Sequence, residues 1–122
     1  VRFAGFIPQR ELQAYYKDAT VLVVPSVWPE PIATIGLEAM KSGLPVVGFD
    51  SGGIQDWLKD GENGFLVPWM DTKKFAEALD TLMRDKQLAK RMGENGLQQA
   101  TQKYNFNQYI DRLHNTLMGL SA

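Results

Sequence analysis

Two hydrophobic patterns alternate along the first half of the chain. Continuous apolar, β-branched runs, the pattern of strands buried on both faces, lie at 20–24 and 45–49, with a shorter run at 65–67. Between them, apolar residues at helical spacing predict a helix that begins near Pro8 and another over 34–43. Strands alternating with helices predict an α/β fold with a doubly wound parallel sheet and right-handed connections.

The ends of the chain carry different patterns. Residues 1–4 predict a short strand that stops at Gly5, and 54–58 predict a short helix. From Asp71, a candidate N-cap, the pattern is helical and predicts a helical C-terminal tail. Three helices are expected there, the second weakened in its middle by Gly93 and Gly96. Their apolar residues are Phe75, Leu79 and Leu82; Leu88 and Met92; Tyr109, Ile110, Leu113 and Leu117.

Composition narrows the possible functions. The 122 residues suffice for one domain, and a net charge of −1 predicts neither nucleic-acid binding nor attraction to an anionic membrane. No cysteine is present, which excludes disulfides and a cysteine nucleophile, and no apolar run predicts a membrane span. The chain begins without Met inside a strand-like run. We therefore expect residues 1–122 to form a single partial domain of a longer protein.

Two glutamates mark the first candidate site. In a parallel sheet, ligands bind beyond the carboxyl ends of the strands, where the loops 25–33 and 50–53 fall. Pro31 keeps Glu30 in the first loop, whereas Glu38 lies in the first or second turn of the following helix. Glu38 either complements the helix dipole, with Glu30 solvated, or turns into the cleft and accepts two hydroxyl hydrogen bonds from a ribose diol.

The start of the same helix favours an anion. The amides of Ala33, Thr34 and Ile35 are unpaired there, but the dipole contributes only about 0.3–1 kcal/mol. Micromolar affinity requires roughly 8 kcal/mol. This turn can therefore orient a phosphate but needs a cation to hold it, and Lys17 is the only one between Arg10 and Lys41.

Other candidates are weaker. The amides of 51–53 could approach a ligand, or the segment is a plain tight turn. His114, the only histidine, is expected at the surface, and Trp28, Trp57 and Trp69 in the core or on cleft walls. No Ser-His-Asp arrangement, Walker loop or zinc-ligand spacing is present.

The order of these motifs resembles the C-terminal, donor-binding domain of retaining GT-B-fold glycosyltransferases (glycosyltransferase family 4, group 1), over nearly the whole chain. The matching segments are Phe3-Ala4-Gly5, Pro25-Ser26, Glu30, Gly36-Leu37-Glu38-Ala39-Met40, Gly43-Leu44-Pro45-Val46-Val47, Gly52-Gly53-Ile54-Gln55-Asp56, Asp60-Gly61-Glu62-Asn63-Gly64-Phe65-Leu66-Val67 and Arg91-Met92-Gly93.

The resemblance implies a role for each site residue. Glu38 would bind the ribose hydroxyls of a UDP-, GDP- or ADP-sugar, and Glu30, the candidate catalytic residue, would contact the transferred sugar. The backbone of Pro31, Ile32, Ala33 and Thr34 would line the sugar and the diphosphate, and Phe6 and Ile7 would approach the base. No cofactor or essential metal is implied. Ile32 and Ala33 depart from the family's aromatic-glycine pair, and Ala33 leaves less room for the donor.

The resemblance also implies what lies outside the chain. The Arg and Lys that clamp the diphosphate, and the N-terminal acceptor-binding domain, belong upstream of Val1. We therefore expect a hexosyltransferase whose isolated donor domain is inactive, in a cytoplasmic protein that can associate peripherally with the membrane. The alternatives are a non-catalytic nucleotide- or sugar-binding α/β module and a GT-B-like sugar-nucleotide epimerase.

Overall fold

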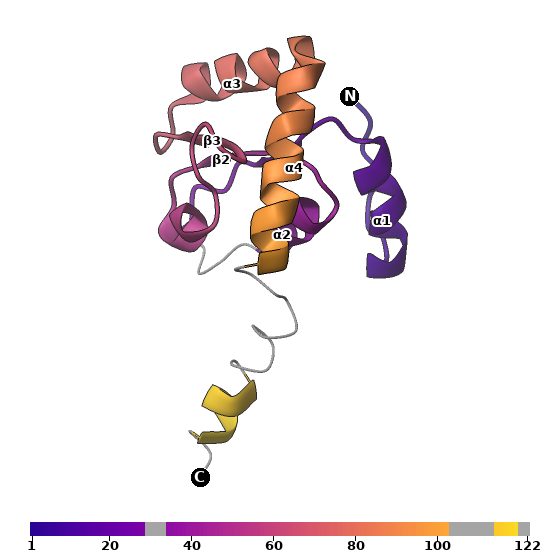
Figure 1. Ribbon diagram of the computed structural model, residues 1–122, viewed down its shortest axis with the longest axis vertical. Helices are drawn as coiled ribbons and strands as arrows, with labels where there is room; N and C mark the ends of the chain where they lie inside the picture. The colour runs from indigo at the N-terminus through magenta and orange to yellow at the C-terminus, as the bar shows by residue number, and fades with distance from the viewer. Residues whose placement is uncertain (29–33, 103–113, 120–122) are drawn as a thin grey trace.

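The computed structural model describes residues 1–28, 34–102 and 114–119 (Figure 1). Three parallel strands form one sheet in the order β1 (Leu22–Val24), β2 (Val46–Phe49) and β3 (Gly64–Val67). In this register Val23 lies opposite Val47, and Val47 lies opposite Phe65. The predicted parallel α/β architecture is confirmed.

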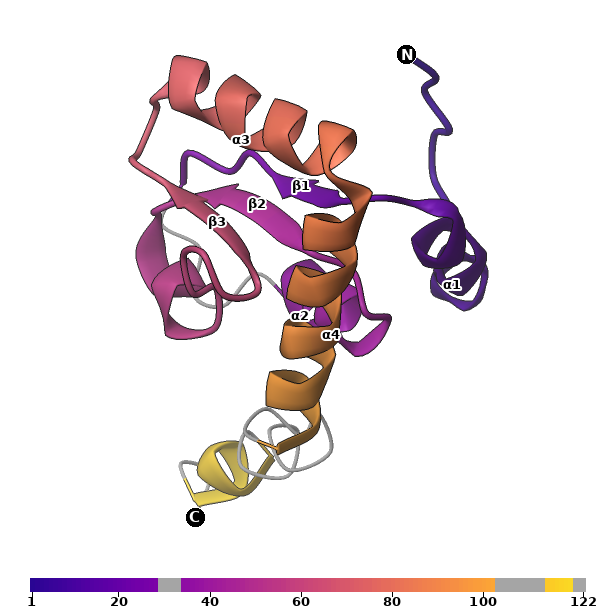
Figure 2. The same ribbon diagram turned by 45° about the horizontal axis from the view of Figure 1, so that its top comes forward.

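Helices cover both faces of the sheet, as a doubly wound fold requires (Figure 2). The helices are α1 (Gln9–Asp18), α2 (Thr34–Lys41), the 3₁₀ helix η1 (Gly52–Asp56), α3 (Thr72–Arg84) and α4 (Lys86–Gln102), with further helical residues at 114–119. One core cluster joins α1, α2 and η1 to the face that carries Val24 and Val46. The other joins α3 to the face that carries Val47, Phe49 and Val67. The last predicted helix lies largely outside the described residues.

The three described strands differ in burial because, among them, only β2 has a strand on both sides. All four residues of β2 are buried, as its apolar run predicts. In β1 only Val24 is buried, and Val23 is 41% exposed, so the prediction of a strand buried on both faces is wrong there. Among the described residues β1 is an edge strand, and the α3 cluster is built mainly on β2 and β3.

The strand predicted over residues 1–4 is absent as well. These residues precede α1 without regular structure, and Phe3 is 94% exposed. A strand is stabilised by hydrogen bonds to a neighbour, and no strand of the described sheet pairs with this segment. The apolar pattern of residues 1–4 is therefore not sufficient to form a strand.

Glycines allow α4 to pack closely against α2. Helix α4 is continuous through Gly93 and Gly96, and its stability in the middle stays a prediction. A Cβ at Gly93 would lie 2.0 Å from the carbonyl oxygen of Gly43, which ends α2 with a φ of +73° as predicted. A Cβ on Gly36 of α2 would lie 2.1 Å from the buried ring of Trp57. Gly93 and Gly36 are therefore needed, the first for the close contact of α4 with Gly43 and the second for the packing of α2 against Trp57.

Candidate functional site

Side chains brace the loops at the carboxyl edge of the sheet. The strands end there at Val24, Phe49 and Val67. The buried Ser51 hydroxyl donates a hydrogen bond to the carbonyl of Trp28, and Trp69 Nε1 donates to the carbonyl of Val27 at 3.0 Å. These two hydrogen bonds join the loop after β1 to the loops after β2 and β3 at this edge of the sheet.

The structure describes some of the predicted site residues. Glu30, Pro31, Ile32 and Ala33 lie outside the described residues, so their roles stay predictions. Thr34 is the first residue of α2. Phe6, which is 93% exposed, and the half-buried Ile7 directly precede Pro8, the N-cap of α1.

Glu38 lies on the half-buried face of α2 that looks toward α1. Gln9 Nε2 donates to its Oε1 at 3.1 Å, and the hydroxyl of Tyr16 donates to its Oε2 at 3.1 Å. A hollow of about 180 Å³ adjoins the carboxylate, and its lining residues are Gln9, Leu12, Gln13, Glu38 and Lys41. The carboxylate is therefore held against α1 by Gln9 in its first turn and Tyr16 in its last turn, and Ile7 lies two residues before Gln9 in the sequence.

Of the two residues that donate hydrogen bonds to Glu38, Tyr16 is the more deeply buried. Its side chain is only 5% exposed and belongs to the core cluster of α2. Burial, then the negative charge of Glu38 and the hydrogen bond to it, raise the pKa of Tyr16 to about 12. At neutral pH this hydroxyl is protonated and donates to the carboxylate.

The shift gives a testable dependence of stability on pH. The folded-state pKa of Tyr16 is raised from 10.0 to about 12, so its contribution is complete below pH 10 and is lost as the pH rises through 12. The free energy of unfolding should fall by about 2 kcal/mol more in the wild type than in Tyr16→Phe over this range. Urea unfolding at both ends of the range measures this, and equal slopes for the two proteins would contradict it.

The sequence did not indicate that Glu38 has partners in α1. By its spacing Tyr16 is only one more apolar residue of the helix that begins near Pro8, and Gln9 is an ordinary polar residue in its first turn. A signal was present, because Gln9, Leu12 and Tyr16 are spaced by three and four and share one helical face. Since that face is polar at both ends and apolar between, it predicts a polar partner on the neighbouring helix.

The second candidate turn has a structural role. Gly52 adopts a φ of +58°, which favours glycine, and the hydroxyl of Ser51 braces the loop that contains Trp28. These contacts support the tight-turn interpretation. Of the three tryptophans, Trp57 is in the core, whereas Trp28 and Trp69 are 76% and 61% exposed at the braced edge. His114 is exposed, as expected.

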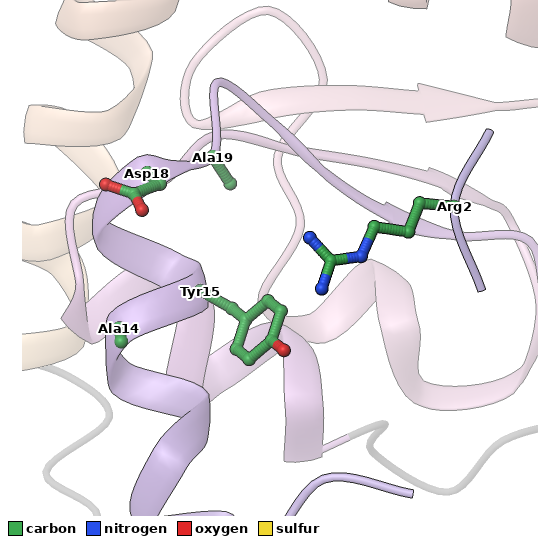
Figure 3. A pocket seen from close by; sticks show the side chains of 5 residues that line it. All are labelled: Arg2, Ala14, Tyr15, Asp18 and Ala19. Carbon is green, nitrogen blue, oxygen red and sulfur yellow. The ribbon is translucent and has the colours of Figure 1, made fainter. Parts of the chain in front are cut away.

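A second hollow, of about 410 Å³, lies on the opposite face of α1 (Figure 3). The guanidinium of Arg2 points toward the ring of Tyr15 across it. Its other lining residues are Ala14, Asp18 and Ala19, so it contains none of the predicted site residues. Within the described parts of the chain, no cluster of three or more His, Asp or Glu could hold a metal ion. No helix of those same parts is both long and apolar enough to cross a membrane.

Solved structures share this architecture. Sucrose-phosphate synthase from Thermosynechococcus elongatus superposes with a TM-score of 0.84 over 98% of this chain and 30% of its own, at 32% identity. HepE from Anabaena, in complex with UDP and glucose, gives a TM-score of 0.84 over 97% of this chain and 32% of its own, at 25% identity. Both are larger proteins that contain a similar unit.

Sequence relatives agree with the structures. D-inositol 3-phosphate glycosyltransferase from Frankia alni is 42% identical over 84 residues, which are 69% of this chain and 20% of that protein. Spore coat protein SA from Bacillus subtilis is 26% identical over 93% of this chain, which spans 30% of that protein. The family described as glycosyl transferases group 1 matches residues 1–99. This match, together with the GT-B-like α/β fold, shows that the chain belongs to the group 1 glycosyltransferases.

Proposed function

We propose that this chain is the donor-binding part of a glycosyltransferase that moves a hexose from a nucleoside diphosphate sugar to an acceptor with retention of configuration. One observation carries the proposal. The carboxylate of Glu38 is held against α1 by Gln9 and Tyr16, beside a hollow, and Gln9 is close in sequence to Ile7. A carboxylate in such a position suits a ribose whose base lies along 6–7.

Each site residue then has a distinct role. Glu38 accepts the ribose hydroxyls, and the segment of Phe6 and Ile7 approaches the base. The backbone of 31–34 lines the transferred sugar and the diphosphate, and the start of α2 at Thr34 orients the phosphates. Glu30 contacts the sugar at the reacting face, where positioning and charge stabilise an oxocarbenium-like transition state.

The remaining parts of the active site lie elsewhere in the parent protein. The chain spans 20% to 30% of the curated relatives described above. We propose that 1–122 is one partial Rossmann-like domain, that an N-terminal domain binds the acceptor, and that upstream cations clamp the diphosphate without a metal. The isolated chain is then inactive, and the parent acts in the cytoplasm.

Donor titration of the full-length protein tests this function. Calorimetry with UDP-, GDP- and ADP-sugars should show saturable binding of one nucleotide class, and UDP is the first probe because the HepE complex contains it. Product analysis with an acceptor should show a new glycosidic bond of unchanged anomeric configuration. Binding without transfer would support a non-catalytic module instead. Conversion of the donor sugar without an acceptor would support an epimerase.

A further inference from the structure

The two hydrogen bonds that hold Glu38 differ in their surroundings. Tyr16 is 5% exposed and is packed among Leu37, Met40 and other residues of the core cluster. Gln9 is exposed on the first turn of α1. The bond to Oε2 is therefore part-buried, whereas the bond to Oε1 is exposed and can exchange with solvent or with a ligand.

We propose that Tyr16 is the positioning residue that presents Glu38 to the ribose of the donor, and that Gln9 occupies Oε1 only until a ribose hydroxyl displaces it. The proposal rests on the proposed function, because it assumes that a nucleotide binds at Glu38. It adds a residue of α1 to a site otherwise assigned to α2 and the loops.

Tyr16 is suited to this role by its geometry. A glutamate side chain on a helix has several rotamers, and binding a diol in one of them requires that the others be excluded. The ring of Tyr16 is packed in the core, so its hydroxyl occupies one lone pair of Oε2 and leaves the remaining lone pairs of the carboxylate for the ribose hydroxyls. The pKa of about 12 keeps this hydroxyl a donor throughout the physiological pH range.

The amide of Gln9 can be displaced from Oε1 of Glu38 by a ligand. This amide is at the surface, where water replaces the lost hydrogen bond at little cost. The hollow of about 180 Å³ that Gln9 lines with Leu12, Gln13 and Lys41 gives the displaced amide room. A ligand hydroxyl then meets Oε1 at the open side of the carboxylate.

The experiment uses the full-length protein and UDP, GDP and ADP, each with its 2′-deoxy form. Tyr16→Phe should weaken the best-bound nucleotide about tenfold, the effect of losing one hydrogen bond to a charged group. The preference for the ribose form over the 2′-deoxy form should also shrink toward one. In turnover the KM for the donor should rise while kcat at saturation changes little. Gln9→Ala should bind at least as tightly as wild type.

Tyr15→Phe is the matched control. It removes the same hydroxyl from the adjacent residue, which is 47% exposed and lines the hollow on the other face of α1. It should leave the Kd and the ribose preference unchanged. Thermal melting of all variants verifies the fold, and because Gln9 is exposed, the Gln9→Ala arm does not depend on how well Tyr16→Phe folds.

The experiment distinguishes a failure of the proposed function from a failure of the inference about Tyr16 and Gln9. If the wild type binds none of the nucleotides, the proposed function is wrong. If the wild type binds and Glu38→Ala does not, the inference is overturned by a Tyr16→Phe protein with wild-type affinity and ribose preference. It is also overturned by a Gln9→Ala protein that loses affinity as Glu38→Ala does.

Discussion

Glu38→Ala in the full-length enzyme should lower kcat/KM for the donor by about a hundredfold or more. The carboxylate is expected to accept two ribose hydroxyls, and each hydrogen bond to a charged group contributes about 1.5–3 kcal/mol. Their combined loss corresponds to roughly 10² to 10⁴ in kcat/KM. Because ribose is distant from the reacting bond, most of the change should appear in KM. Initial rates over a range of donor concentrations measure both parameters.

The control for this substitution is Glu77→Ala. Glu77 is an exposed glutamate on α3, a helix of the opposite core cluster, and its replacement should leave kcat/KM within about twofold. Glu38→Ala also leaves the Tyr16 hydroxyl without its partner, so unfolding must be measured in parallel. A correctly folded Glu38→Ala enzyme with wild-type kinetics would mean that the ribose is bound elsewhere.

Asn63→Asp should be among the most destabilising isosteric changes in this chain. Asn63 is fully buried, and its Oδ1 accepts from the amide of Lys59 at 2.9 Å. Its Nδ2 donates to the carbonyl of Trp57 at 2.8 Å and to Oε1 of Gln99 at 2.6 Å. A carboxylate cannot donate. Gln99 can turn its amide to compensate, but the carbonyl of Trp57 cannot, and the new charge is desolvated.

We expect a loss of about 3 kcal/mol or more in the free energy of unfolding. Urea denaturation at neutral pH measures it, and acidification should recover part of the loss because a protonated carboxyl donates one hydrogen bond. The matched control is Asn95→Asp, which breaks a single exposed bond to the carbonyl of Glu62 and should cost less than about 1 kcal/mol. Equal effects of the two substitutions would refute the structural role assigned to Asn63.

Elements set by local patterns could be predicted from the sequence. The apolar run of β2 and the spacing in α3 depend on neighbouring residues in the chain. So does the cap of α3, where Asp71 Oδ1 accepts from the amide of Lys74 at 3.0 Å. The stop of α2 at Gly43 was predicted for the same reason. These features require no knowledge of what packs against them.

Features that depend on distant partners are not specified by the local pattern. Within the described sheet, the strand expected over 1–4 has no pairing neighbour, and Val23 is exposed because β1 lies at the edge. The close contact of Gly93 with Gly43 joins residues far apart in the sequence. In the candidate site, Glu38 was identified, but its partners Gln9 and Tyr16 lie 29 and 22 residues away. The roles of 30–33 stay predictions.

The contact between Gly93 and Gly43 has a mechanical consequence. No side chain lies between the two backbones, so no change of rotamer can absorb a displacement of one helix against the other. A force applied to the Gln102 end of α4 is therefore transmitted directly to the helix that bears Glu38. A contact made with that end of α4 would therefore shift Glu38 together with α4, because the two helices are joined backbone to backbone.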